Sequence, residues 1–296
     1  MGTRVGFVGA GAMGLPMARR LLDQGHAVTV YARTPAKVVS LLDSGATLAA
    51  SPAEAAAGSV VVFGCLRDEQ AIADVYVGER GLLGAVGPGQ TLVEHGTIAP
   101  DLARSLAERA AERGAAFLDV PVTGGPQRAR EGSLTGLAGG SADRLAAVLP
   151  LLRAYCGEVF HVGPVGGGLE LKLVNQLLVS VHIAAAAEAA ALIARLGLDP
   201  APTKQALMSG WAASTMLDYC IPAALTADAT ASAATIGGMA EVQGLVADLA
   251  TSSDLSLPVF AAAQDLFTAR VAAGAAVADL SQVARAYDPS LTTKAS

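Results

Sequence analysis

Short apolar runs alternate with amphipathic stretches along the first half of the chain. The apolar runs have the length of buried strands, and the stretches between them, such as Met13 to Gln24 and Ala36 to Asp43, have helical spacing. The runs predicted to be strands are Val5 to Val8, Ala27 to Tyr31, Val60 to Cys65, Thr91 to Glu94 and Ala116 to Val120. Strands that alternate with helices predict parallel βαβ units, and hence a doubly wound α/β sheet.

The pattern changes after about Gly163. From Leu169 onward the chain is rich in alanine and leucine at helical spacing, interrupted by glycines and prolines. We therefore expect residues 1–163 to form the sheet domain and residues 164–296 to form an all-helical C-terminal domain. The glycines of His161 to Gly168 favour a boundary there, from which a long interdomain helix leads out of the first domain.

Composition narrows the class of protein. With 296 residues, of which 52% are hydrophobic and 16% charged, the chain suits a soluble globular protein. The apolar stretch Leu173 to Leu196 contains too many polar residues for a bilayer span, so no membrane partner is expected, and no signal-peptide pattern precedes the first strand. Three widely spaced cysteines predict neither disulfides nor a metal site and favour a cytoplasmic location. A net charge of -6 without a basic run argues against nucleic acid.

A glycine pattern follows the first predicted strand. Gly9, Gly11 and Gly14 form G-x-G-x-x-G at the start of the first predicted helix, which is the arrangement of a dinucleotide-binding turn in a Rossmann domain. Free N–H groups at such a helix start can bind pyrophosphate. We therefore expect the cofactor-binding residues to be Gly9, Ala10, Gly11, Ala12, Met13 and Gly14. A tight strand-to-helix turn without a ligand could use glycines in the same way.

The end of the second predicted strand indicates which cofactor binds. NAD-specific sites usually place a carboxylate there, whereas this chain has Ala32 and Arg33. An arginine can hold a 2′-phosphate by two hydrogen bonds, and Thr34 and Lys37 can add a hydroxyl and a second positive charge. We predict that NADP(H) is preferred over NAD(H). The alternative is a solvated basic loop with no role in binding.

The segment Leu118 to Gly125, with the sequence LDVPVTGG, lies at the end of another predicted strand. Ligands of open α/β sheets bind beyond the carboxyl ends of the strands. The backbone of Gly124 and Gly125 and the hydroxyl of Thr123 could bind an anion such as a carboxylate. The segment taken alone could also be a plain turn.

Lys172 and Asn175 lie three residues apart on the predicted long helix, so that both project from one face. A lysine within so apolar a helix is a candidate acid or base, because burial penalises its charged form. Its long side chain could equally reach solvent and have no catalytic role.

Three segments together resemble the β-hydroxyacid dehydrogenase family. They are GFVGAGAMGLPMARRL, DVPVTGGPQRAREGSLTGLAGG and GGGLELKLVNQ, in this order and spacing. The family includes 3-hydroxyisobutyrate dehydrogenases and reductases of tartronate and succinic semialdehyde. The resemblance, which covers nearly the whole chain, implies a Rossmann domain, a long interdomain helix, a helical domain, and a homodimer or homotetramer.

The resemblance also implies a role for individual residues. It makes Lys172 the catalytic lysine, Thr123, Gly124 and Gly125 the cradle of the substrate carboxylate, and Asn175 the residue that orients substrate and lysine. It further implies that Cys65 and Leu66 contact the cofactor through their backbone, and that Thr97 lies near the nicotinamide.

The chain departs from the family pattern at two pairs of residues. His95 and Gly96 stand where the family often has serine before the loop threonine, and Glu241 and Val242 align with a family Lys-Asp pair. His95 could be a second proton donor or a packing residue. A carboxylate in place of the lysine would disfavour a second anionic group on the substrate.

We therefore predict an NADP(H)-dependent enzyme that interconverts a small β-hydroxy acid and its semialdehyde. Two other functions stay open. Imine reductases are a related branch that usually replaces the lysine by Asp or Tyr, and some relatives without the lysine are non-catalytic cofactor-binding modules. Lys172 argues against both alternatives.

Overall fold

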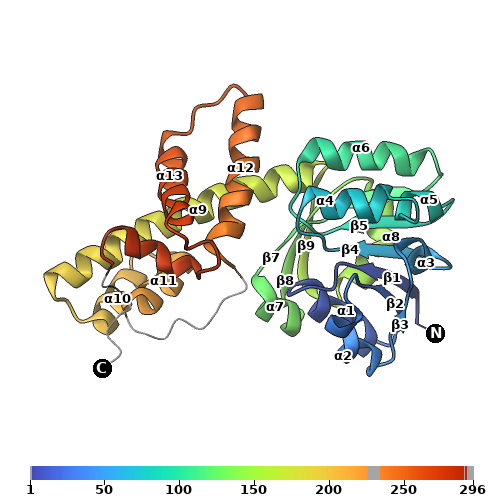
Figure 1. Cartoon of the computed structure of the whole chain (residues 1–296), viewed down its shortest axis with the longest axis horizontal. Coiled ribbons are helices and arrows are strands. Elements are labelled where there is room, and N and C mark those ends of the chain that lie inside the picture. The colour runs from blue at the N-terminus through green and yellow to red at the C-terminus, as the bar shows by residue number, and fades with distance from the viewer. Residues whose placement is uncertain (1, 226–233, 290, 292–296) are drawn as a thin grey trace. The chain divides into compact units, whose positions relative to one another are not determined.

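The computed structural model describes residues 2–225, 234–289 and 291, and the chain divides into two compact units, Met1–Lys172 and Leu173–Ser296. The first unit contains a sheet flanked by helices, and the described residues of the second unit are helical apart from turns and one isolated bridge (Figure 1). The predicted fold class, a Rossmann sheet followed by a helical domain, is confirmed.

The described residues of the first unit form a nine-stranded sheet in the order β3-β2-β1-β4-β5-β6-β8-β7, with β9 paired to β8. Strands β1 to β6 are parallel, β8 is antiparallel to β6 and β7, and β9 is parallel to β8. The strands are β1 Arg4–Val8, β2 Ala27–Tyr31, β3 Thr47–Leu48, β4 Val61–Gly64, β5 Thr91–Glu94, β6 Ala116–Asp119, β7 Val122–Thr123, β8 Leu134–Gly139 and β9 Cys156–Gly163.

All five predicted strands are present, as β1, β2, β4, β5 and β6. Four others were not predicted. Strands β3 and β7 have two residues each, and β8 contains two glycines, which weaken the strand pattern. Strand β9 is largely exposed and has no continuous apolar run. Its conformation depends on pairing with β8, which a local pattern does not reveal.

Successive side chains of the central strands enter two different cores. Phe7 and Val93 pack in one core with the residues of α1 and α8, while Val8 and Leu92 pack in the other with those of α6. Burial on both faces explains why these strands are continuously apolar. The helices that flank the sheet are α1 Gly14–Asp23, η1 Pro35–Val38, α2 Val39–Leu42, α3 Pro52–Ala56, α4 Glu69–Ile72, η2 Ala73–Val77, α5 Leu82–Ala85, α6 Pro100–Ala111, α7 Gly125–Glu131 and α8 Ala142–Leu152. The predicted helix Ala36 to Asp43 is the 3₁₀ segment η1 followed by α2.

Helix α9, Gly167–Leu196, is 30 residues long and continues from the first unit into the second. Within the second unit Ile183, Ala187 and Ala190 are buried in a core with residues of α11, α12 and η3. By length and composition α9 could cross a membrane, but one such helix is a weak indication, because core helices pass the same test. The other helices of this unit are α10 Pro200–Met208, α11 Thr215–Leu225, α12 Ile236–Ser252, α13 Pro258–Ala272 and η3 Leu280–Ala286.

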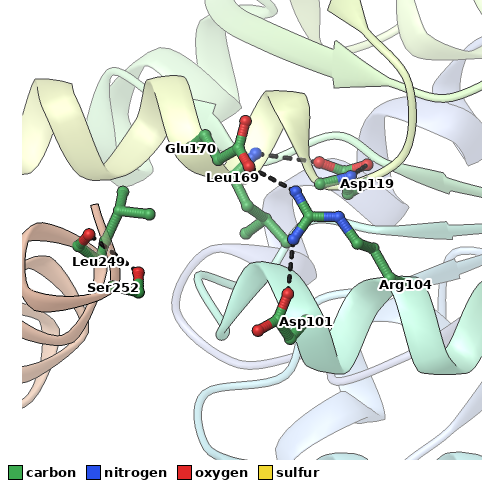
Figure 2. Close-up of polar contacts among 8 residues, drawn as sticks. Asp101, Arg104, Asp119, Leu169, Glu170, Leu249 and Ser252 are labelled. Carbon is green, nitrogen blue, oxygen red and sulfur yellow. Dashed lines mark hydrogen bonds and ion pairs between the residues drawn. The ribbon is translucent and has the colours of Figure 1, made fainter. Parts of the chain in front are cut away.

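The start of α9 is fixed to the sheet by the buried carboxylate of Asp119, the last residue of β6. Its Oδ1 accepts a hydrogen bond from Gly166 N at 2.8 Å. Its Oδ2 accepts one from Leu169 N at 2.9 Å (Figure 2). Gly168 allows this close approach, because a Cβ there would lie 2.2 Å from the Leu137 carbonyl oxygen. The turn that carries Lys172 is therefore held in place by a strand end.

We predict that Asp119→Ala lowers the free energy of unfolding by about 1 to 3 kcal/mol, because two buried N–H groups lose their acceptor. Asp101→Ala is the matched control. Asp101 is an exposed carboxylate that accepts a hydrogen bond from Arg104, so its loss should cost less than about 1 kcal/mol (Figure 2). Urea denaturation followed by circular dichroism measures both, and an equal loss in the two variants would contradict this account.

Candidate active site

Residues predicted to bind the cofactor lie at the carboxyl ends of adjacent parallel strands. The glycine turn follows β1, Arg33 follows β2, Cys65 follows β4 and Thr97 lies in the loop after β5. Strands β1 and β4 are neighbours in the sheet, and the strand order reverses between them. This is the switch point at which open α/β sheets bind ligands.

The three glycines of the first turn have different surroundings. Gly9 has a φ of +83°, and a Cβ there would lie 2.4 Å from the Cys65 carbonyl oxygen, while a Cβ on Gly14 would lie 2.3 Å from the Gly9 carbonyl oxygen. A Cβ on Gly11, by contrast, would meet no described atom within 4 Å. Protein packing therefore explains the glycines at positions 9 and 14, whereas Gly11 lies beside open space at the start of α1.

The start of α1 is suited to an anion. Met13 at its N-cap provides no side-chain hydrogen bond, and the first turn contains no acidic residue. The first N–H groups of a helix have no partner within the helix, and the helix dipole favours negative charge there. These features fit a dinucleotide pyrophosphate at residues 9–14.

Arg33, Thr34 and Lys37 are exposed beyond β2. Within the described part of the chain, neither Arg33 nor Lys37 is engaged in a salt bridge or a side-chain hydrogen bond. The two cations therefore remain free to bind a phosphate.

The loops after β4 and β5 are joined by a residue that the sequence did not single out. Glu94, the last residue of β5, is buried, and its Oε1 accepts hydrogen bonds from Leu66 N at 3.1 Å and Gly96 N at 2.6 Å. Its Oε2 accepts one from the hydroxyl of Tyr76 at 2.8 Å. A charged residue at the end of an otherwise apolar buried strand was the available signal. Burial and Glu94 together raise the pKa of the Cys65 thiol to about 12, so that this thiol stays neutral.

His95 is a packing residue in this structure. It is buried, stacks on Phe63 with ring centroids 5.8 Å apart, and places Nδ1 2.7 Å from the Val120 carbonyl oxygen and Nε2 2.9 Å from the Tyr155 hydroxyl. A carbonyl only accepts, so Nδ1 carries the proton and Nε2 accepts from Tyr155. Burial lowers the pKa of His95 to about 4. Its ring is therefore neutral near pH 7, which makes it unsuited as a proton donor.

Lys172 and the predicted carboxylate cradle come together in the first unit. Lys172 is only 8% exposed, and its Nζ donates a hydrogen bond to the Val122 carbonyl oxygen at 3.0 Å. Val122 directly precedes Thr123, Gly124 and Gly125. Gly124 and Gly125 have positive φ values of +130° and +74°, and Thr123 and Gly125 are partly exposed. A buried amine thus lies against the backbone of a segment whose glycines are accessible.

Burial determines the charge state of Lys172. It lowers the pKa of the amine from 10.5 to about 8, and within the described chain no carboxylate forms an ion pair with it. The side chain therefore does not reach solvent as a surface lysine would. An amine with a pKa near 8 can both donate and accept a proton close to neutral pH.

The remaining predicted positions belong to the second unit. Asn175 lies three residues after Lys172 on α9, and its buried Oδ1 has no hydrogen-bond partner among the described residues. On α12, Glu241 is exposed and Val242 is partly buried beside an apolar cluster. The following Gln243 was not predicted to be of interest, yet it is fully buried, and both atoms of its side-chain amide lack a partner in the described chain.

No group of three or more His, Cys, Asp or Glu residues that could hold a metal ion is found in residues 2–225, 234–289 and 291. Beside the glycine segment, the amine of Lys172 is a group that can donate or accept a proton.

Comparison with known families assigns both parts of the chain. Residues 4–163 match the family described as the NAD binding domain of 6-phosphogluconate dehydrogenase. Residues 166–287 match the family described as NAD-binding of NADP-dependent 3-hydroxyisobutyrate dehydrogenase. The two matches together cover most of the described residues.

Individual relatives agree with this assignment. The 3-hydroxyisobutyrate dehydrogenase of Pseudomonas aeruginosa is 36% identical over 92% of this chain and 94% of its own length. The NAD-dependent L-serine dehydrogenase of the same organism is 34% identical over 97% and 98%. The structure of Psf3 in complex with NADP+ and 2-OPP superposes with a TM-score of 0.89 at 29% identity, and covers 95% of this chain and 99% of its own. This chain is thus a member of the β-hydroxyacid dehydrogenase family and an NAD(P)-dependent hydroxyacid dehydrogenase.

Proposed function

We propose that this enzyme interconverts a small β-hydroxy acid and its semialdehyde, with NADP(H) as cofactor and Lys172 as the acid and base. The observation that carries the proposal is the buried amine of Lys172, hydrogen-bonded to Val122 immediately before Thr123, Gly124 and Gly125. A lysine held in an apolar site without a counter-charge destabilises the folded protein, and a catalytic role accounts for its presence there.

A bound nicotinamide would supply the hydride for reduction and accept it in oxidation. Lys172 contributes the proton. Its ammonium form donates a hydrogen bond and then a proton to the carbonyl oxygen, where negative charge develops during reduction. In oxidation its neutral amine accepts the proton of the substrate hydroxyl. The hydrogen bond to the Val122 carbonyl oxygen orients Nζ in both states.

We propose that Thr123, Gly124 and Gly125 hold the substrate carboxylate and that Asn175 orients the substrate. Glycine exposes backbone N–H groups, and Thr123 adds a hydroxyl donor. The unpartnered Oδ1 of Asn175 is an acceptor available to a hydroxyl or ammonium group.

The cofactor roles are assigned in the same way. Residues 9–14 would bind the pyrophosphate at the start of α1. The residues that would contact the cofactor at the ends of β4 and β5 are Cys65, Leu66 and Thr97. The 2′-phosphate would be bound by Arg33, Thr34 and Lys37. Residues 1–163 would then form the cofactor-binding domain and residues 164–296 the substrate and oligomerisation domain. We further propose a cytoplasmic homodimer or homotetramer.

Oxidation of NADPH in the presence of a panel of aldehydes tests the reaction class. The panel contains glyoxylate, succinic semialdehyde, tartronate semialdehyde, methylmalonate semialdehyde and one cyclic imine. We expect turnover of at least one of the carboxylate-bearing aldehydes. Activity confined to the imine would exclude a carboxylate cradle at Thr123 to Gly125 and favour the imine reductase branch.

Lys172→Met should lower kcat by roughly 10²- to 10⁴-fold, because methionine fills a similar volume without an acid or base. In the wild type we expect the oxidation rate to rise with pH through about 8, where the amine becomes neutral, and the reduction rate to fall over the same range. Steady-state kinetics from pH 6 to 10 would show whether the variant loses this dependence.

Lys204→Met is the matched control for this experiment. Lys204 forms an ion pair with Asp218 at 2.7 Å in the helical unit, so its replacement should leave the pH profile unchanged. Lys172→Met should also retain NADPH binding and unfold no more easily than the wild type at pH 7, since it removes a buried amine. Wild-type turnover in Lys172→Met would exclude Lys172 from the reaction.

Arg33→Ser should raise KM for NADPH by about tenfold or more while changing KM for NADH by less than about threefold, because a charge-assisted pair of hydrogen bonds acts only on the 2′-phosphate. Arg113→Ser, which replaces an exposed arginine just beyond α6, is the control for a change in net charge. Equal effects on NADPH and NADH would favour the solvated-loop interpretation of Arg33.

A further inference from the structure

Glu94 is a buried carboxylate whose hydrogen-bond donors come from three separate segments. Leu66 N and Gly96 N both donate to Oε1, at 3.1 and 2.6 Å, and the Tyr76 hydroxyl donates to Oε2 at 2.8 Å. The residue is 1% exposed, and within the described chain no lysine or arginine forms an ion pair with it. Its stabilisation therefore comes from neutral donors, two of which belong to the loops after β4 and β5.

The backbone around Glu94 is shaped to admit its carboxylate. A Cβ on Gly64 would lie 2.1 Å from Oε2 of Glu94, and a Cβ on Gly96 would lie 2.1 Å from the Leu66 carbonyl oxygen and 2.8 Å from Oε1. Any side chain at either position would push the two loops apart or displace Glu94. Gly96 also belongs to one of the two pairs of residues at which this chain departs from the family pattern, and the close contact with Leu66 gives the glycine a physical reason.

The position of Oε1 sets the distance between two loop backbones. One oxygen atom accepts from both Leu66 N and Gly96 N, so the two amide nitrogens must each lie within hydrogen-bond reach of a single point. Without this acceptor, two buried N–H groups would be unsatisfied, and the loops would have to move to pair them otherwise. Cys65 and Thr97 directly adjoin these two donors.

We propose that Glu94 is a positioning residue for the cofactor, which sets the spacing between the Cys65–Leu66 and Gly96–Thr97 backbones. This inference rests on the proposed function, in which these segments contact the bound dinucleotide. Glu94 itself contacts no substrate atom in this account. It acts through the two amides that its Oε1 holds together.

Three single variants test the role of Oε1. Glu94→Leu keeps a side chain of similar volume that accepts no hydrogen bond. Glu94→Gln retains an oxygen that can accept from both loop amides, while its NH₂ group can donate to the Tyr76 oxygen. Tyr76→Phe removes the third hydrogen bond and leaves both loop amides paired. NADPH is the probe, and its Kd is measured by isothermal titration calorimetry.

We expect Glu94→Leu to raise the Kd for NADPH by about tenfold or more. Glu94→Gln should recover most of the lost affinity, and Tyr76→Phe should stay within about threefold of the wild type. The loss in Glu94→Leu should fall on KM for NADPH rather than on KM for the aldehyde. A general loss of stability would not raise KM for NADPH alone. Thermal unfolding without NADPH measures the stability of each variant separately. Tyr76→Phe also removes a buried hydrogen bond, so it shows how much a loss of stability by itself changes the Kd.

Two results would overturn the inference. One is a wild-type Kd in Glu94→Leu, and the other is an equal loss in Glu94→Gln and Glu94→Leu, which would assign the effect to charge. If Glu94→Leu does not fold, Gly96→Ala tests the same spacing, because its Cβ must displace the Leu66 carbonyl and should also raise the Kd. Failure of the wild type to bind NADPH and NADH would contradict the proposed function instead.

Discussion

Polar backbone groups at the carboxyl edge of a buried parallel sheet need partners that the sheet does not supply. In this chain two carboxylates provide them. Glu94 and Asp119 are the last residues of the adjacent strands β5 and β6, and they lie opposite each other in the strand register. Glu94 accepts hydrogen bonds from backbone N–H groups of the loops after β4 and β5. Asp119 accepts hydrogen bonds from backbone N–H groups at the start of α9. Because unsatisfied buried N–H groups are costly, these two side chains determine where the neighbouring segments lie.

The same strand ends also connect the two groups of candidate site residues. His95 follows Glu94 and accepts a hydrogen bond from Tyr155, while its Nδ1 donates to Val120. Two residues further on, the Val122 carbonyl accepts from Lys172. The segment after β6 is thus held by hydrogen bonds from a neutral histidine and from an amine. A glycine-rich loop gains a defined position in this way although its own residues have weak conformational preferences.

The sequence was informative where function depends on local pattern. The strand-turn-helix context of Gly9, Gly11 and Gly14 predicted the turn. The apolar helix around Lys172 left a buried and a solvent-reaching lysine open, and the structure has the buried one with a lowered pKa. It was uninformative where a role depends on residues distant in the chain. The contact of Glu94 with Leu66 spans 28 residues and that of His95 with Tyr155 spans 60. Strand β8 was missed because its two glycines weaken the local pattern, while its pairing with β6, β7 and β9 is not visible in the sequence.

The energetics of Lys172 explain why such a framework is needed. At pH values below about 8 both the folded and the unfolded chain carry the ammonium form, and the folded chain holds it in an apolar site. The lowering of the pKa from 10.5 to about 8 corresponds to about 3 kcal/mol of lost stability under those conditions. Between pH 8 and 10.5 the unfolded chain binds more protons, so stability rises with pH. Burial of the sheet on both faces and the hydrogen bonds of Asp119 to the first turn of α9 help to offset this cost. An amine whose pKa is about 8 is thus held within a well-packed part of the first unit.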